Sequence, residues 1–318
     1  MAPTGQPADG GRFGVRLPLV LALAALALLL GGGYGSYAYL HDYDLYRGFP
    51  PPSEPASIPH GRLLTRSFYS PALRHRRSYL IYLPPGYTRE AGAGRRFPVL
   101  YMLHAPVGRA RNYIQTGGLG VRVDELLHRR RIHPFLTVIP VAHSPLGTDH
   151  EWANGDQGRY EDFVLDTVRA VDARWRTRRQ RSARMLAGLS AGAYGATNIT
   201  LHRPARFGGF ESWSGYYLED RKDAFRGASA ARLSANSPSE YLASHAGTLR
   251  RFPVTAYLYQ GRHDDVPVTQ MLAFGRSLRA TGSRVRVSVY GGKHNWVLWR
   301  ARFSPGLVFA SRAFARHG

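Results

Sequence analysis

The sequence predicts an α/β fold in which helices cover both faces of a mostly parallel central sheet. Two observations predict this class: short apolar runs alternate with helical stretches, and a glycine-flanked serine lies where a strand is expected to turn into a helix. Strands that are apolar throughout, rather than at every second residue, are typical of sheets buried on both faces. With 318 residues and 44% apolar content, the chain is long enough for one large core.

The expected elements follow one another in an alternating order. Runs rich in β-branched and aromatic residues predict strands, and apolar residues at helical spacing predict helices. The strands are expected at 78–83, 98–104, 135–141, 183–187, 254–259 and 285–290, and the helices at 123–131, 160–176, from 191 onward and at 269–280.

Composition and charge exclude several classes of protein. The chain has no cysteine, which rules out a thiol nucleophile, a disulfide framework and a thiolate zinc site. The formal net charge is +22, but the arginines are scattered along the chain, and the densest clusters lack interleaved aromatic residues that would stack on bases. We therefore predict no nucleic-acid partner, no metal and no cofactor. The sequence leaves the oligomeric state open.

The amino-terminal part predicts a membrane-directed segment. Residues 1–16 form a polar tail containing Arg12 and Arg16, and residues 17–40 are uncharged and long enough to cross a bilayer. The apolar half of this run would also suit a cleavable signal peptide. By the positive-inside rule the tail lies in the cytoplasm. The expected location is the cell membrane, with one pass and an extracytoplasmic catalytic domain, or secretion if the segment is cleaved.

Two further regions follow the apolar segment. Residues 41–61 contain five prolines and are expected to form a stiff stalk. Residues 62–318 hold all the expected strands and helices after the stalk, and are therefore expected to form a single catalytic domain.

Residues 188–192, Gly-Leu-Ser-Ala-Gly, carry the motif that points to chemistry. They follow the strand expected at 183–187 and open a helix, which is the setting of a nucleophile elbow. In such an elbow the hydroxyl of Ser190 would stand over the carboxyl ends of the strands. The plainer interpretation of Ser190 is an ordinary helix N-cap, and the strand before the turn favours the elbow.

A serine hydroxyl needs a base to take its proton, and the base needs a carboxylate to orient it. The expected order along such a fold is serine, acid, histidine. Asp264 and Asp265 follow the strand expected at 254–259, and His294 follows the strand expected at 285–290. His263 is a competing base. Spacing alone leaves Asp264 and Asp265 nearly equal.

The motifs together resemble the esterase family of α/β-hydrolases that includes S-formylglutathione hydrolases, feruloyl esterases, siderophore esterases and secreted mycolyltransferases. The similar segments are 77–87, 97–104, 161–163, 188–192, 204–207, 213–215, 261–264 and the region around His294. The resemblance implies an α/β-hydrolase fold and a triad of Ser190, Asp264 and His294. It favours Asp264 because the family has an acid three residues after a glycine, here Gly261.

The resemblance also implies an oxyanion hole, and here the chain departs from the family. Where a backbone donor is frequent, this chain has Pro106, which carries no N–H. Ala191 is the first expected donor. The second would be Ala105 or Val107.

The expected function is an extracytoplasmic serine esterase that forms an acyl-enzyme on Ser190 with a small-molecule or lipid ester. Two alternatives remain: an acyltransferase of the mycolyltransferase type, and a catalytically silent binding domain with the same fold. His104, Trp152 and Trp296 are the predicted substrate contacts, and local packing is the alternative for Trp152.

Overall fold

The computed structural model describes residues 16–105, 109–142 and 150–316. It divides into two compact units, Met1–Pro50 and Pro51–Gly318. Within the first unit, α1 (Arg16–Tyr46) is a single helix, and its stretch Val20–Tyr43 is long and apolar enough to cross a membrane. The helix extends past the predicted end at residue 40 because residues 41–46 contain neither proline nor glycine. It stops before Gly48, which has φ 77, and Pro50.

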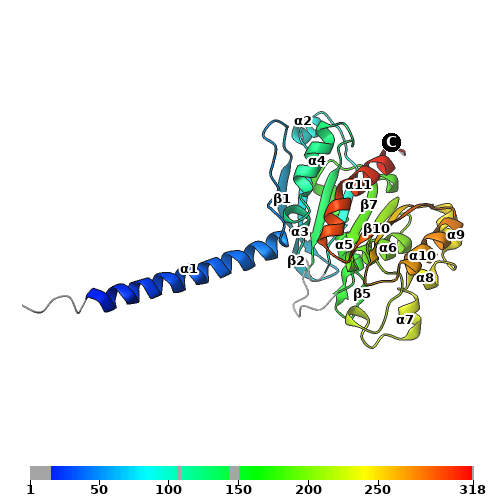
Figure 1. Cartoon of the computed structure of the whole chain (residues 1–318). Helices are drawn as coiled ribbons and strands as arrows, with labels where there is room; N and C mark the ends of the chain where they lie inside the picture. Colours follow the sequence, from blue (N-terminus) through cyan, green and yellow to red (C-terminus); the bar gives the residue numbers. More distant parts are fainter. Residues whose placement is uncertain (1–15, 106–108, 143–149, 317–318) are drawn as a thin grey trace, which may run out of the picture. The chain divides into compact units, whose positions relative to one another are not determined.

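The second unit is built on an eight-stranded sheet in the order β1-β2-β4-β3-β7-β8-β9-β10 (Figure 1). The pairs β1–β2 and β2–β4 are antiparallel. Every other neighbouring pair, from β4 across to β10, is parallel. The strands are β1 (Arg62–Ser70), β2 (His75–Leu83), β3 (Val99–Leu103), β4 (Leu136–Val141), β7 (Arg184–Leu189), β8 (Gly209–Trp213), β9 (Thr255–His263) and β10 (Arg284–Lys293).

Helices cover both faces of this sheet. The longer ones are α4 (Leu119–His128), α5 (Tyr160–Arg174), α6 (Ala191–His202), α10 (Val268–Ala280) and α11 (Trp296–Ala315). The shorter ones are α2 (Tyr87–Gly92), α3 (Asn112–Gln115), α7 (Ala230–Ser234), α8 (Pro238–Tyr241) and α9 (Ala246–Arg251). Two 3-10 turns, Arg181–Ala183 and Asp223–Phe225, and a small hairpin of β5 (Asn154–Gly155) and β6 (Gly158–Arg159) complete the unit.

Alternation along the strands divides the core into two layers. In β3, Val99 and Tyr101 belong to the layer that packs with α5, α6 and α10. Leu100 and Met102 point to the other face, where they join residues of α4 and α11. Because both faces are buried, β3 is apolar throughout, which is the pattern that predicted a parallel sheet.

The predicted fold class is confirmed. Besides the small hairpin and the short helices, three main elements were missed. β1 is a half-exposed edge strand without a continuous apolar run. β8 carries a charged residue, Glu211, in the middle of a fully buried strand. α11 contains Pro305 in its interior, a residue that ordinarily argues against a helix. In each case tertiary packing forms the element although the local sequence pattern does not predict it.

Candidate active site

The turn between β7 and α6 holds Ser190 in a conformation that few residues adopt. Its φ is 55° and its ψ is −126°, and its backbone N–H donates to the carbonyl of Trp213 at 3.0 Å. A Cβ at Gly192 would lie 1.9 Å from the carbonyl oxygen of Leu103, and one at Gly188 would lie 2.1 Å from that of Gly192. The flanking glycines are therefore required by close backbone contact.

Three side chains from three strand ends meet at this turn. His294 Nε2 lies 2.9 Å from the Oγ of Ser190, and His294 Nδ1 lies 2.7 Å from Oδ1 of Asp264. Ser190 follows β7, Asp264 follows β9 and His294 follows β10, all at the carboxyl ends of parallel strands. The sheet thus assembles residues that are 104 and 30 positions apart in sequence.

The surroundings of Asp264 favour its ionised form. Burial alone raises the pKa of this carboxyl, but the hydrogen bonds from His294 and Ser214, the charge of His294 and the Gly261 N–H together lower the pKa below its usual value. Its side chain has no exposed surface. An ionised carboxylate at Nδ1 keeps a proton on that nitrogen and leaves Nε2 free to accept one.

The structure separates the competing residues by exposure. His263 and Asp265 are both exposed at the end of β9, whereas the Asp264 side chain is buried against His294. No hydrogen bond between either exposed residue and Ser190 occurs in the described part of the chain. The geometry therefore brings together the acid and the base that the family resemblance favours.

Two of the predicted oxyanion donors, the amides of Ala191 and Ala105, belong to described residues. The amide of Ala191 opens helix α6, and that of Ala105 follows β3. Across the described residues neither amide has a hydrogen-bond acceptor, as expected for the first turn of a helix in the case of Ala191. Val107, the other predicted donor, lies outside the described residues.

His104 and Trp152 are not surface groups, which goes against their prediction as substrate contacts. The exposed fraction is 0% for Trp152 and 3% for His104. The Trp152 indole donates to the carbonyl of His104 at 2.8 Å, and the His104 ring bonds the Ala105 carbonyl at 2.9 Å and accepts from Ala142 at 3.3 Å. The local-packing alternative therefore describes Trp152.

The contacts of the buried Trp152 side chain link helix α6 to the end of β3. A Cβ at Gly195 of α6 would lie 2.4 Å from Cβ of Trp152, so the indole is wedged between α6 and the end of β3. A trans peptide points its carbonyl and its N–H in opposite directions. The bond to the His104 carbonyl therefore fixes the direction of the Ala105 N–H.

Trp296 is the one predicted substrate contact that keeps exposed surface. It is half-buried at the start of α11, with ring contacts to Tyr113 and Trp299. It lies two residues after His294, and its role as a substrate contact stays a prediction.

Ser214 and Trp299 are site residues that sequence reasoning missed. Ser214 is fully buried, has φ 55° and is one of the groups that lower the pKa of the Asp264 carboxyl. Trp299 donates its indole N–H to the Ser214 hydroxyl at 3.0 Å and packs edge-on against the His294 ring at 5.1 Å. Ser190, Asp264 and His294 were predicted because each follows an expected strand. Ser214 directly follows β8, so predicting β8 would have identified it in the same way.

Comparison with known proteins identifies the family. A family described as "Putative esterase" matches residues 70–310. Because the match covers well over half of the chain, the protein belongs to this esterase family and is a hydrolase of the carboxylic-ester class.

A curated relative and several solved structures are similar to the chain. An endo-1,4-beta-xylanase/feruloyl esterase of Xylanibacter ruminicola is 29% identical over 175 residues, which is 52% of this chain and only 23% of that protein. A ferulic acid esterase structure has a TM-score of 0.70 at 22% identity, covering 80% of this chain and 99% of its own. An S-formylglutathione hydrolase from Agrobacterium tumefaciens has a TM-score of 0.64 at 15% identity, covering 84% and 100%. These two likenesses bear on the fold alone.

Proposed function

We propose that the protein is a serine esterase in which Ser190, His294 and Asp264 form the catalytic triad. The observation that carries the proposal is the pair of hydrogen bonds at His294, one to the serine and one to the buried carboxylate. That arrangement can activate a hydroxyl and hold the resulting imidazolium.

The reaction follows from these positions. His294 Nε2 takes the proton of Ser190 as Oγ attacks the ester carbonyl carbon, and the carbonyl oxygen becomes an oxyanion facing the Ala191 and Ala105 amides. The imidazolium then gives its proton to the departing alkoxide, which leaves as the alcohol. A water gives a proton to His294, attacks the acyl-enzyme, and releases the carboxylic acid while Ser190 recovers its proton.

Replacement of the triad residues tests the assignment. Ser190→Ala removes the nucleophile, so hydrolysis of a short aryl ester should fall by about 10⁴-fold or more. His294→Gln and Asp264→Asn should also lose most activity. The matched controls His263→Gln and Asp265→Asn alter exposed neighbours and should keep near-normal turnover. Full activity of Ser190→Ala, with loss in the controls, would refute the triad.

Feruloyl esters are the first substrates to test, because the xylanase/feruloyl esterase relative carries that activity in its name. Product analysis with added sugar or lipid alcohols separates hydrolysis from acyl transfer. Esterified acceptor as the main product would replace the hydrolase proposal by the transferase.

We further propose that α1 anchors the protein as a single-pass helix, with the esterase domain outside the cytoplasm. The span Val20–Tyr43 is 24 residues long with mean hydropathy 1.6, and Arg12 and Arg16 precede it. The mass of the mature chain tests this proposal. A chain that keeps residues 17–40 and resists carbonate extraction supports an anchor, whereas loss of that segment indicates a signal peptide.

A further inference from the structure

The chain enters the esterase domain on the side that holds the candidate active site. Pro52 packs on the start of helix α4, where a Cβ at Gly118 would lie 3.6 Å from the Cβ and Cγ of Pro52. Helix α4 connects the end of β3 to the start of β4, which runs parallel to β3. The helix therefore runs back across the sheet and begins where the parallel strands end. We call this side of the domain the carboxyl edge.

The segment that follows Pro52 is held to the domain by several contacts. Ile58 is buried, and the N–H of Gly61 donates to the Tyr82 hydroxyl and to the Asp124 carboxylate, both at 3.1 Å. Asp124 belongs to α4. The chain therefore follows this helix after its entry, and the point of entry at Pro52 is fixed at the carboxyl edge.

Helix α3 lies between this point of entry and the candidate active site. It ends three residues before Gly118 and carries Tyr113. The Tyr113 hydroxyl donates to the carbonyl of Leu103 at 2.8 Å, at the end of β3. The Tyr113 ring lies 6.1 Å from the ring of Trp296, two residues after His294. One short helix thus connects the entry of the chain to the surroundings of the triad.

The connection from the proposed membrane span to Pro52 is short. The span ends at Tyr43, and α1 continues to Tyr46. With a rise of about 1.5 Å per helical residue and about 3.5 Å per extended residue, Pro52 stays within about 25 Å of the bilayer surface. A domain with the length of Pro51–Gly318 is about 45 Å across. Because the connection is shorter than the domain is wide, the carboxyl edge stays near the bilayer at any angle between α1 and the domain.

The exposed apolar side chains of the domain lie on the same edge. Among the described residues from Pro51 onward, three large apolar side chains are exposed: Tyr69 at 57%, Leu218 at 43% and Val297 at 64%. Tyr69 is next to the last residue of β1, which runs in the same direction as β4. Leu218 follows the end of β8, and Val297 is the second residue of α11, three residues after His294.

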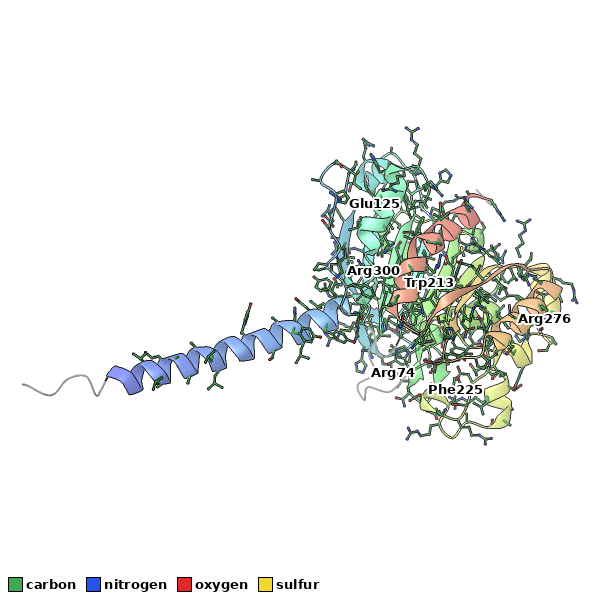
Figure 2. The ribbon with its side chains drawn as sticks, viewed as in Figure 1. Arg74, Glu125, Trp213, Phe225, Arg276 and Arg300 are labelled. Atoms are coloured by element: carbon green, nitrogen blue, oxygen red, sulfur yellow. The ribbon has the colours of Figure 1, made fainter. Side chains whose placement is uncertain are left out.

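The placement of these side chains carries the argument, because single exposed apolar residues are ordinary on a protein surface. Arg74, in the turn after β1, and Phe225, in the connection after β8, both lie on the lower side of the domain in Figure 2. The carboxyl end of α11 lies on the opposite, upper side (Figure 1). Apolar side chains and the entry of the chain thus share the edge that holds Ser190.

We propose that the carboxyl edge rests on the bilayer that holds α1, and that Ser190 hydrolyses esters of lipids in this bilayer. The inference rests on the proposed anchor and on the proposed triad. Apolar side chains at the rim of the site enter the boundary between headgroups and acyl chains. A lipid in the same membrane is present at high effective concentration for an active site that is tethered beside it.

The substrate class is a carboxylic ester of a long acyl chain. The Oγ of Ser190 bonds to the acyl carbon, the bond to the alcohol oxygen breaks, and that oxygen receives its proton from His294. Water then attacks the acyl-enzyme and releases the fatty acid, while Ser190 recovers its proton. No reactant besides water and the lipid ester is required.

Quenching of a dye by nitroxide-labelled phosphatidylcholine tests the contact with the bilayer. The chain has no cysteine, so Val297→Cys and Ala315→Cys each give a unique attachment site on an exposed residue, near opposite ends of α11. The two positions are about 27 Å apart along the helix. With the full chain in phosphatidylcholine vesicles, quenching should be strong at position 297 and near background at position 315. Equal quenching at both positions, or stronger quenching at 315, would overturn the proposal.

Two esters with the same leaving group test the substrate class. 4-Methylumbelliferyl palmitate resides in the bilayer, whereas 4-methylumbelliferyl acetate is soluble. Palmitate in the enzyme's own vesicles should turn over at least about tenfold faster than the same amount in separate, enzyme-free vesicles. Equal rates in the two arrangements would show that the site does not draw its substrate from the bilayer that holds the anchor.

A triple variant tests the exposed apolar side chains of the edge. Tyr69→Ser, Leu218→Ser and Val297→Ser together should slow palmitate hydrolysis in vesicles by about tenfold, because less apolar surface enters the bilayer. Acetate turnover should stay normal. The matched control changes three exposed alanines on the opposite side of the domain and should leave both rates unchanged. It combines Ala93→Ser, Ala280→Ser and Ala315→Ser. Equal palmitate rates in the two triple variants would contradict the role of the edge.

The outcomes separate this inference from the two proposals on which it rests. Acetate turnover by Ser190→Ala in detergent tests the triad alone, and extraction of the full chain with carbonate tests the anchor alone. Normal acetate turnover by an anchored chain that leaves palmitate in its own vesicles intact would overturn only the inference of a lipid ester.

Discussion

Ser214 links the acid of the candidate triad to the last helix of the domain. Its hydroxyl accepts from the Trp299 indole at 3.0 Å, and it is one of the groups that lower the pKa of the Asp264 carboxyl. We therefore predict that Ser214 acts as a positioning residue through Asp264.

Ser214→Ala should lower kcat/KM by roughly tenfold or more, because the Asp264 carboxylate loses one of the groups that favour its charged form. The pKa of Asp264 is held below its usual value, so this carboxylate stays ionised down to acidic pH. Without the hydroxyl its pKa should rise, and the acid limb of the pH profile should move to higher pH.

Ser214→Gly separates the hydroxyl from the backbone. Glycine accepts the φ of 55° without strain, so it loses only the hydrogen bonds. If both variants lose activity to a similar extent, the hydroxyl is responsible. Normal activity and an unmoved acid limb in Ser214→Gly would contradict the positioning role.

We predict that Trp152 is a second positioning residue and that it acts through its indole N–H. Trp152→Phe keeps most of the ring packing against Gly195 but loses the bond to the His104 carbonyl. With the Ala105 amide less well directed, kcat should fall by about tenfold while KM stays unchanged.

A matched control uses another tryptophan with the same kind of bond. The indole of Trp175 donates to the Tyr79 hydroxyl at 3.0 Å, on the outer part of the domain. Trp175→Phe should leave kcat unaltered. An equal fall of kcat in both variants would show a general loss of packing instead of a role in the oxyanion site.

At the scale of elements, the contact between α6 and the end of β3 determines the site geometry. Gly192→Ala would place a methyl group 1.9 Å from the Leu103 carbonyl oxygen, so helix and strand must separate. We expect a lower melting temperature and loss of esterase activity, because both candidate oxyanion amides flank this contact. Thermal unfolding and aryl-ester turnover measure the two effects.

Gly247→Ala is the matched substitution in helix α9. A Cβ there meets nothing closer than 3.9 Å, and alanine is the better helix former by about 1 kcal/mol. This variant should unfold at the same or a slightly higher temperature with normal activity. A stable and active Gly192→Ala variant would show that the close contact is not required.

At the scale of the whole molecule, one buried carboxyl makes stability depend on pH. Burial raises the pKa of Glu211 to about 8, against smaller opposing effects of Trp213 and Arg286. In the unfolded chain the same group ionises near pH 4.3. Between these values the folded protein holds a proton that the unfolded chain has released, so stability falls as pH rises.

Glu211→Gln should remove this dependence. It keeps an acceptor for the Trp213 indole and cannot ionise. The free energy of unfolding should therefore no longer fall by about 1.4 kcal/mol per pH unit between pH 4.3 and about pH 8. Denaturant unfolding at pH 5, 7 and 8.5 measures this free energy. Glu240→Gln, at an exposed position, should leave the slope unchanged; an identical slope in both variants would contradict the assignment to Glu211.

The grouping of the arginines in space is also visible only at the scale of the whole domain. Along the sequence they are dispersed, which argued against a binding surface. The parallel topology gathers the strand starts and the helix carboxyl ends at one edge, where Arg284 and Arg312 line one hollow and Arg96 and Arg178 line another. A charge pattern invisible along the chain is therefore a property of the folded domain.

The sequence by itself determined the parallel α/β class, the turn at Ser190 and the two strands that precede the acid and the base, because these depend on periodicity and glycine spacing within a few residues. Tertiary structure decided which of two histidines reaches Ser190 and which of two aspartates reaches that histidine, since exposure and direction depend on packing. It also decided that the Trp152 indole binds the His104 carbonyl inside the domain, that Ser214 influences the Asp264 carboxyl, and that arginines from distant segments line the same hollow. Each of these depends on residues brought together from distant parts of the chain, and no local pattern records such contacts.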